Sequence, residues 1–339
     1  MKYDDAMYGT VNITESVLLD LMASNAMQRL KGVSQHGITA LLGITAPFSR
    51  FDHSVGAMLL VRHLGASLEE QIAALLHDVS HTAFSHVIDF VFNDRGGQSY
   101  HEDKMEWFVA ASDIPRILNK HGKEWRDFAD EQNFRILEQA SPALCADRLD
   151  YFIRDLEFLG LATGSEISAA IESWVVVDGR IAVNNPDAAR WLAYTFIEAD
   201  RASWSSFREV GLYQLTAEAI KAATQLGFVE EKDLWGTDEA LWEKLCSVDH
   251  VDVRRLINLV TPGTRFTWDE EYPVFRVATK VRSIDPPVKV GTTVIPLSEL
   301  DPAFGRYREK YLAGKRGPWP MGVVSAPGIL ALTSPSPRT

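Results

Sequence analysis

Apolar residues recur every three to four positions through most of the first half of the chain, and this spacing predicts a helical fold. Asn12 and Thr14 are candidate caps for the first helix, and Ser67 is a candidate cap for the third. Because each such helix buries one apolar stripe, we expect this region to form a helical core. The predicted helices span 14–30, 54–65, 68–78, 101–112 and 130–159.

The second half of the chain contains strand signals as well as helical spacing. Asp178 and Gly179 are flanked by two runs rich in β-branched residues in the segment 174–184, which is the pattern of a two-residue hairpin. Helical spacing returns over 188–226, and 273–297 alternates like short strands broken by proline and glycine. We therefore predict a mainly α fold whose parts pack together. These parts are a helical core at 1–165, a mixed α/β region at 166–324 and a flexible Ser- and Pro-rich tail at 325–339.

Charge and cysteine content exclude several classes of protein. The formal net charge is −12, whereas binding of duplex nucleic acid needs clustered Lys and Arg, so no such partner is expected. Cys145 and Cys246 are too few for a disulfide framework or a Cys-rich zinc module, and they suit a reducing compartment. The sequence has no apolar run of about 18 residues, and its acidic N-terminus does not resemble a secretory signal. We therefore expect a cytoplasmic protein without a membrane partner.

Histidines gather in one window of the sequence. Six of the nine lie between residues 53 and 101, and five of these six stand beside an acidic or small polar residue. His77 and Asp78 are adjacent at the expected end of the third helix, where neighbouring side chains can reach one ion. Imidazole nitrogen and carboxylate oxygen together suit a divalent transition metal. His53 and a later carboxylate, for which Asp147 is the candidate, would complete a set of four ligands. A surface pair is the alternative for the His-Asp dipeptide alone.

Five sequence blocks carry a resemblance to a known family. They are QRLKGVSQ (28–35), RFDHSVG (50–56), LLHDVSHTAFSHVID (75–89), HE (101–102) and ADRLDYFIRD (146–155). In this order they closely resemble the HD superfamily of metal-dependent phosphohydrolases. Within it they are similar to the branch of the SAM-and-HD-domain deoxynucleoside triphosphate triphosphohydrolases, as a short form without the SAM domain. The resemblance covers about residues 5–165, with weaker matches at 280–286 and 296–300. It implies an HD-domain helical core and a smaller mixed α/β C-terminal part that contains the hairpin.

The resemblance also implies a metal site. One divalent ion (Mn, Fe, Co, Ni, Zn or Mg) would act as a Lewis acid and lower the pKa of a bound water, and a second Mg²⁺ could arrive with the substrate. A dinuclear variant, in which His81 and His101 hold a second ion, stays open. The implied ligands of the main site are His53, His77, Asp78 and Asp147.

His81, His86 and His101, which lie outside this ligand set, are implied to bind phosphate and to move protons. His81 would contact the phosphate under attack. Asp89 lies three residues after His86 on the same helix face, where its carboxylate would fix the imidazole tautomer and raise its pKa. His86 could then act as a general acid. His101, next to Glu102, is the second candidate acid, and the sequence does not rank the two.

Further residues match substrate contacts of that branch. Arg50 and Arg148 match cations that bind phosphate, for which the arginine fork is well suited. The residues that match sugar contacts are Gln35, Tyr151 and Asp155.

The chain departs from the branch at two places. The segment 198–211 offers Arg201, Trp204 and Arg208, but it lacks the His and Tyr spacing that closes the base pocket and phosphate tail in that branch. Ala23 stands where the branch has an acid of its regulatory nucleotide site. Nucleotide activation and the associated tetramer are therefore not implied.

These features predict an HD-type metal-dependent phosphohydrolase that acts on a small-molecule nucleotide or phosphate ester. The first expectation for the substrate is a (deoxy)nucleoside triphosphate, cleaved at the α-phosphorus to nucleoside and triphosphate. The alternative is a nucleoside monophosphate phosphatase or a phosphodiesterase with the same metal site. Two further alternatives stay open. One is a non-catalytic nucleotide sensor, and the other is a di-iron oxygenase, because some proteins of this fold are di-iron oxygenases. A homo-oligomer is left open.

Overall fold

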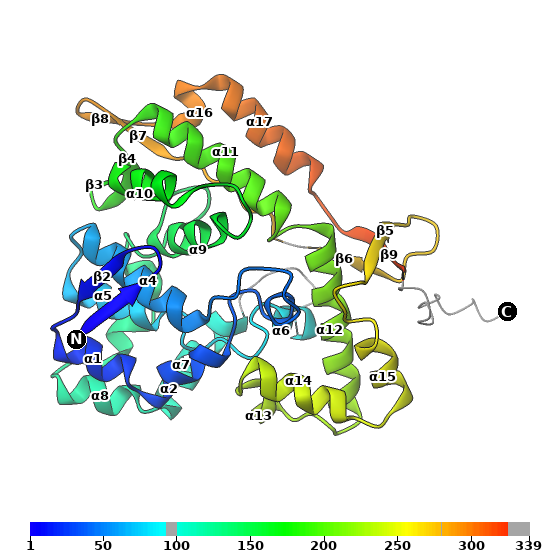
Figure 1. Ribbon diagram of the computed structural model, residues 1–339. Coiled ribbons are helices and arrows are strands. Elements are labelled where there is room, and N and C mark those ends of the chain that lie inside the picture. The colour runs from blue at the N-terminus through cyan, green and yellow to red at the C-terminus, as the bar shows by residue number, and fades with distance from the viewer. Residues whose placement is uncertain (93–99, 279, 325–339) are drawn as a thin grey trace.

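The computed structural model describes residues 1–92, 100–278 and 280–324, and there the fold is mainly helical, as predicted (Figure 1). Three small sheets accompany the helices, with strand orders β1-β2, β3-β4-β7-β8 and β5-β9-β6. The expected tail at 325–339 lies outside the described residues. The strands are β1 Lys2–Asp5, β2 Gly9–Asn12, β3 Trp174–Val177, β4 Arg180–Val183, β5 Arg265–Trp268, β6 Phe275–Val277, β7 Pro287–Val290, β8 Thr293–Pro296 and β9 Trp319–Val324.

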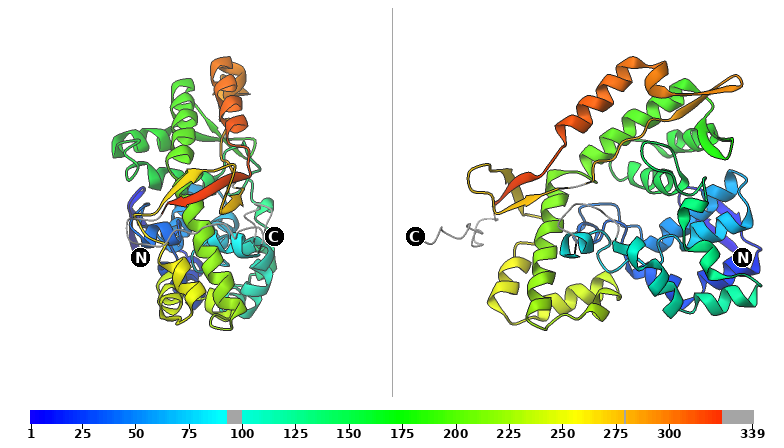
Figure 2. Two further views of the ribbon diagram at one scale, coloured as in Figure 1. Left: turned by 90° about the vertical axis from the view of Figure 1, so that its right-hand side faces the viewer. Right: turned by 180° about the vertical axis from the view of Figure 1, so that it is seen from behind.

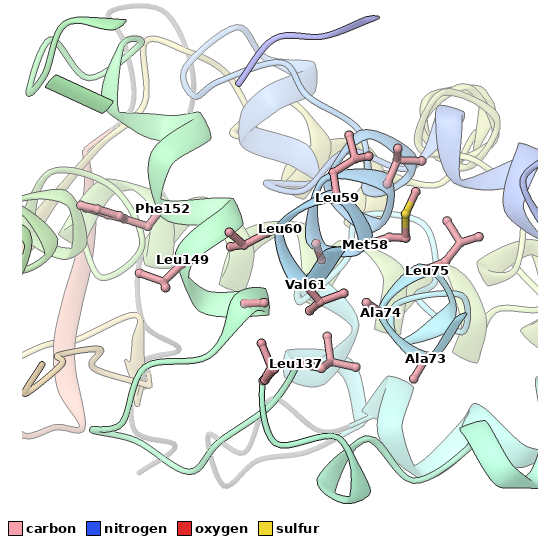
Figure 3. Close-up of a cluster of buried hydrophobic side chains, with 14 of the residues drawn as sticks. Met58, Leu59, Leu60, Val61, Ala73, Ala74, Leu75, Leu137, Leu149 and Phe152 are labelled. Atoms are coloured by element: carbon pink, nitrogen blue, oxygen red, sulfur yellow. The ribbon is translucent and has the colours of Figure 1, made fainter. Parts of the chain in front are cut away.

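Helices α4 and α5 form the centre of the N-terminal half, and α9 packs against α4. Figure 3 shows Leu60 of α4 pointing toward Leu149 of α9, while Met58 lies on the side of α5. All three side chains are fully buried, and each such burial stabilises the fold by roughly 1.5–3 kcal/mol. The helices of this half are α1 Ser16–Met22, α2 Asn25–Arg29, α3 Ile38–Leu41, α4 Arg50–His63, α5 Leu68–Leu76, α6 Val87–Phe92, α7 Tyr100–Ala111, α8 Ile114–Lys120 and α9 Ala146–Leu156, with 3-10 turns η1 Leu30–Gly32, η2 Trp125–Phe128 and η3 Glu131–Asn133.

Side-chain caps set the starts of α4 and α5. Ser49 caps α4 in a capping box with Asp52, so the helix begins at Arg50. Ser67 accepts a hydrogen bond from a backbone N–H of α5, as predicted. The predicted caps of the first helix are wrong. Asn12 pairs with β1 as the last residue of β2, and α1 begins only at Ser16.

The helix expected at 130–159 forms only in its last part, as α9, and the residues before Ala146 run mostly as a loop. Glu70, in the first turn of α5, accepts hydrogen bonds from the backbone N–H groups of Ile136 and Leu137, at 2.7 and 3.2 Å. A neighbouring element therefore satisfies backbone groups that a helix would have paired internally.

The hairpin of the second half forms as predicted. Asp178 and Gly179 make the turn between β3 and β4 with φ of 51° and 72°, in the left-handed region that these residue types tolerate. The helix expected over 188–226 is divided, because a turn at 203–206 separates α11 from α12. The strands expected in 273–297 form as β6, β7 and β8. The helices of this half are α10 Gly164–Ser173, α11 Pro186–Ala202, α12 Phe207–Gln225, α13 Glu231–Leu234, α14 Asp238–Ser247, α15 Val251–Ile257, α16 Leu297–Leu300 and α17 Pro302–Gly314.

Two hydrophobic clusters join the halves of the chain. Figure 2 shows α11 and α17 side by side, and α12 running past α6 toward α14 and α15. The larger cluster unites Phe152 of α9 with Phe196 of α11 and Phe304 of α17. The second unites Phe84 with Leu215 of α12. Both clusters cross residue 165, and the domain boundary there stays a prediction. In the stretches that the structure describes, no helix has both the length and the apolar character needed to cross a bilayer.

Candidate metal centre and active site

The four predicted metal ligands converge from three elements. His53 lies in the first turn of α4, His77 and Asp78 directly follow α5, and Asp147 lies in the first turn of α9. His53 Nε2 lies 2.9 Å from Asp147 Oδ1, 3.3 Å from His77 Nε2 and 3.6 Å from Asp78 Oδ2. His77 Nε2 lies 3.5 Å from Asp147 Oδ1. Two imidazole nitrogens and two carboxylates thus face one point.

Both imidazoles are oriented by a hydrogen bond at the nitrogen that faces away from this point. His53 Nδ1 donates to Asp150 Oδ2 at 2.8 Å, and His77 Nδ1 donates to the Ala74 carbonyl oxygen at 2.7 Å. In the neutral ring each Nε2 is then left with a lone pair directed at the convergence point. This is the usual support of a metal-binding histidine. Sequence reasoning missed Asp150, although it lies one helical turn after Asp147.

The electrostatics of the cluster favour a cation. Burial works against the charge of Asp78, but Arg50 and His77 outweigh it and hold its pKa well below the usual range. Burial likewise opposes a charge on Asp147, but hydrogen bonds with His53 and His77 hold its pKa well below the usual range. Burial opposes protonation of His77, yet the nearby carboxylates raise its pKa to about 10. The donor set of nitrogen and oxygen atoms therefore fits a divalent metal ion.

Three further histidines lie together beside this cluster. The ring of His81 stacks on that of His101 with centroids 3.8 Å apart, and the ring of His86 meets His81 edge-on at 5.1 Å. His81 Nε2 lies 3.2 Å from Asp78 Oδ1, which ties the group to the metal ligands. Within the described residues, Nδ1 of His81 and Nδ1 of His101 are buried without a hydrogen-bond partner. Such nitrogens are available to a ligand.

Asp89 orients His86, as the spacing predicts. His86 Nδ1 donates to Asp89 Oδ2 at 3.0 Å, and Asp89 Oδ1 accepts from the backbone N–H of Tyr100 at 2.9 Å. The effect on pKa differs from the expectation, because burial outweighs the carboxylate and lowers the pKa of His86. Burial, with His86 nearby, lowers the pKa of His101 to about 3. Both rings are therefore neutral in the absence of a bound anion.

The two predicted phosphate-binding arginines have protein partners. Arg50 Nη1 donates to Asp78 Oδ2 at 2.6 Å, and its Nε donates to Ser85 Oγ at 3.0 Å. Arg148 Nη1 donates to the Ala143 carbonyl oxygen at 2.6 Å. Arg50 is thus held against a candidate metal ligand, and Arg148 contacts the loop before α9.

The three predicted sugar contacts differ in their surroundings. Gln35 Oε1 is buried with no partner among the described residues. Tyr151 meets the ring of Trp204 edge-on, with centroids 5.0 Å apart. Asp155 is buried and already paired, because it accepts hydrogen bonds from His36 Nε2 and Trp204 Nε1, each at 2.7 Å. In this structure its carboxylate therefore holds His36 and Trp204, two residues that line the cavity, in place.

One cavity of about 160 Å³ brings these groups together. Of the predicted site residues, all but His53, Asp89 and Asp155 are among the described residues that line it. Those three lie behind the lining and contact it through the pairs given above.

Sequence reasoning missed several lining groups. Lys280 and Arg282 supply positive charge from the segment that follows β6. The weak match at 280–286 was the available signal for them. Glu131 and Glu138 add two carboxyl groups from the segment before α9, and burial raises their pKa to about 8 and about 7. No sequence motif marks these two residues as part of the site, and the segment that contains them was expected to be helical.

Comparisons with known proteins identify the family of this chain. The HD domain family model matches residues 50–155, which span all four ligand candidates. The chain is similar to the metal-dependent phosphohydrolase cns2 of Cordyceps militaris, with 35% identity over 321 residues, covering 92% of each protein. A deoxynucleoside triphosphate triphosphohydrolase SAMHD1 homolog of Dictyostelium discoideum is 26% identical over 211 residues, covering 52% of this chain and 40% of that protein.

A solved structure shares the fold. The phosphohydrolase BT4208 of Bacteroides thetaiotaomicron superposes with a TM-score of 0.65 at 19% sequence identity, covering 88% of this chain and 94% of that one. Together with the sequence relatives, this agrees with the predicted helical HD core. The chain belongs to the HD-domain family of metal-dependent phosphohydrolases.

Proposed function

We propose that this chain hydrolyses a nucleotide whose phosphate binds beside the metal ligands. One observation carries the proposal: His77, Asp78 and Asp147, three of the four candidate metal ligands, line one cavity with His81, His86 and His101 and with Arg and Lys side chains, and His53 contacts Asp147 from behind the lining. When bound, the metal ion would supply a Lewis acid and a water of lowered pKa. His53, His77, Asp78 and Asp147 would hold it.

The chain's own residues support the bond cleavage in two ways. Arg50 and Lys280 line the cavity and offset the charge of a bound phosphate. His86 and His101 are neutral in the buried cavity, and an anionic phosphate nearby would favour their protonated forms. Either ring could then give its proton to the leaving oxygen, and Asp89 holds His86 in orientation for this transfer.

A deoxynucleoside triphosphate, cleaved at the α-phosphorus, is the first candidate substrate. The name of the Dictyostelium relative states that activity for that protein. The cations that line the cavity, Arg50, Arg148, Lys280 and Arg282, are of the kind that a polyphosphate needs.

A nucleoside monophosphate is the second candidate, and the charge of the cavity favours it. Glu102, Glu131 and Glu138 line the cavity in addition to the two carboxylates of the metal set. Burial raises the pKa of all three side chains, to about 8 for Glu131 and about 7 for Glu138, so they repel the additional charges of a triphosphate tail increasingly as the pH rises and they ionise. A nucleoside monophosphate would therefore be repelled less by these acidic side chains than a triphosphate.

A phosphorus NMR assay tests the proposal. Purified protein with Mn²⁺ and Mg²⁺ is mixed with deoxynucleoside triphosphates in one series and with nucleoside monophosphates in another. Inorganic triphosphate would support the first candidate, and orthophosphate released from monophosphates would support the second. The Asp147→Ala variant, which lacks a metal ligand, should give neither product. Tight nucleotide binding by the wild-type protein with no product over hours would indicate a sensor and overturn the proposal.

A further inference from the structure

Glu209 occupies a position where an acidic side chain normally caps its own helix. It is the third residue after Ser206, the N-cap of α12, and Ser206 Oγ accepts a hydrogen bond from the Glu209 backbone N–H at 3.2 Å. In α4 and α10, Asp52 and Glu166 at the same position return a hydrogen bond to the cap residue. Glu209 does not, because the N–H of Ser206 donates to the carbonyl oxygen of Ser203 instead.

The side chain of Glu209 lines the cavity of the metal site. The residue is only 5% exposed, and the contacts of its carboxylate in the described chain are with two hydroxyl groups, a long hydrogen bond of 3.4 Å from Thr39 Oγ1 and the nearby hydroxyl of Ser203. Buried carboxylates are normally compensated by strong hydrogen bonds or by an ion pair. Glu209 is therefore an acceptor that faces the cavity with most of its hydrogen-bonding capacity unused.

The surroundings of Glu209 suit the nucleoside part of a nucleotide. Trp204 and Tyr213, which precede and follow Glu209 in the chain, also line the cavity, and flat aromatic side chains can pack against a base or a sugar. Gln35 Oε1, a buried acceptor without a hydrogen-bond partner among the described residues, belongs to another residue that lines the cavity. His36 lies close enough to Glu209 to interact electrostatically with it.

We infer that Glu209 accepts a hydrogen bond from the nucleoside part of the substrate and so determines which nucleotides bind. The donor is either a sugar hydroxyl or an N–H group of the base, since both offer the same chemistry to a carboxylate. The inference rests on the proposed function. It makes Glu209 a substrate-binding residue, separate from the metal ligands and from the histidines that transfer protons.

A cycle of enzyme variants and substrate analogues tests this role. Wild-type protein and the Glu209→Gln variant are compared in kcat and KM, with one substrate series that lacks the 2′- or 3′-hydroxyl and another that lacks amino groups on the base. The matched control is Glu218→Gln, on the same helix, whose carboxylate pairs with Gln214 and Lys221. Metal content and thermal midpoint are recorded for each protein.

The expected result is a KM raised about tenfold or more in Glu209→Gln, with wild-type metal content and little change in Glu218→Gln. A substrate analogue without the hydrogen-bond donor that Glu209 recognises should have a much higher KM than the full substrate with the wild-type enzyme. With the Glu209→Gln variant the two KM values should differ little. The series that shows this coupling identifies the donor as sugar or base. An increase in the KM of Glu209→Gln that is equal for all analogues would indicate a structural role and overturn the inference. An unchanged KM would also overturn it.

The inference and the proposed function fail separately. If the wild-type protein hydrolyses no nucleotide, the proposed function fails, and calorimetry with unphosphorylated nucleosides replaces the kinetic assay. Nucleoside binding that is present in the wild type and weakened about tenfold or more in Glu209→Gln would then still support Glu209. Absence of nucleoside binding by the wild type, or equal binding by both proteins, would overturn it.

Discussion

Asp150 Oδ2 lies 2.8 Å from Nδ1 of His53, on the ring nitrogen that faces away from the metal ligands. The same carboxylate accepts hydrogen bonds from Arg154 Nε at 2.8 Å and from the Tyr8 hydroxyl at 2.9 Å. Asp150 is fully buried, so these contacts fix its position and through it the orientation of His53. A residue that does not line the cavity therefore sets the direction of Nε2 of His53, a candidate metal ligand.

The Asp150→Asn substitution should weaken metal binding by roughly 10–100-fold, because an amide is a poorer partner for the imidazole N–H than a carboxylate. Metal titration of the purified apoprotein measures this change. The control is Asp127→Asn, which changes an exposed acid in η2 and should bind metal as the wild type does. Wild-type affinity in Asp150→Asn would show that His53 needs no such support.

Gly56 allows Asp150 and Arg154 to approach α4. A Cβ added at Gly56 would lie 2.0 Å from Arg154 Nη2 and 2.2 Å from Asp150 Oδ1. Both side chains are buried and hydrogen-bonded to each other, so neither can move freely. We expect Gly56→Ala to lower the free energy of unfolding by about 1–3 kcal/mol and to weaken metal binding.

Urea unfolding at fixed metal concentration measures the effect of Gly56→Ala. The control is Gly314→Ala, at the end of α17, because an added Cβ there meets no atom within 4 Å. That variant should be neutral or stabilised by up to about 1 kcal/mol. Equal stability of the two variants would contradict the close packing at Gly56.

The ligand set and the proton-transfer group should respond differently to truncation. Asp147→Ala removes a carboxylate that contacts both His53 and His77, so bound metal and activity should be lost together. His86→Ala and His101→Ala should retain metal and slow turnover by roughly 10²–10⁴-fold. Metal analysis and initial rates on the same preparations separate the two outcomes. Loss of metal from His101→Ala would favour the dinuclear arrangement, and loss of metal from His86→Ala would make His86 itself a ligand.

The main features of the site could be predicted from the sequence because they combine local signals. His77 and Asp78 are adjacent in the sequence, and Ser67 caps the helix that ends at this pair. The resemblance supplied the distant partner Asp147, which local spacing alone could not identify. The helical class followed from apolar spacing in the same way, and the hairpin followed from Asp178 and its neighbour.

Other features depend on contacts between distant segments, for which local spacing carries no signal. The loop before α9 has apolar spacing like that of a helix, but Glu70 of α5 binds its backbone, which only the folded structure shows. Glu209 has the sequence signature of a capping box, so its position in the cavity could not be inferred from the residues around it. His36 stands alone in the sequence, and its partner Asp155 lies 119 positions away.

The pair of His36 and Asp155 should make stability depend on pH. Burial opposes a charge on His36, but the Asp155 carboxylate 2.7 Å away outweighs burial and raises the histidine pKa. Glu209 raises it further, whereas Arg50 lowers it. A group whose pKa is higher in the folded protein stabilises the fold fully below its unfolded pKa of about 6.5. That contribution is lost as the pH rises through the folded value.

The destabilisation caused by His36→Gln should therefore be largest near pH 6 and should shrink as the pH rises toward 9. Urea unfolding of the variant and the wild type at equal metal loading, in steps across this range, measures the difference. Trp204→Phe provides the control, because it removes another donor to Asp155 but no titrating group. Its effect should change less with pH. A difference between His36→Gln and wild type that stays constant or grows with pH would show that His36 is not held in its charged form by Asp155.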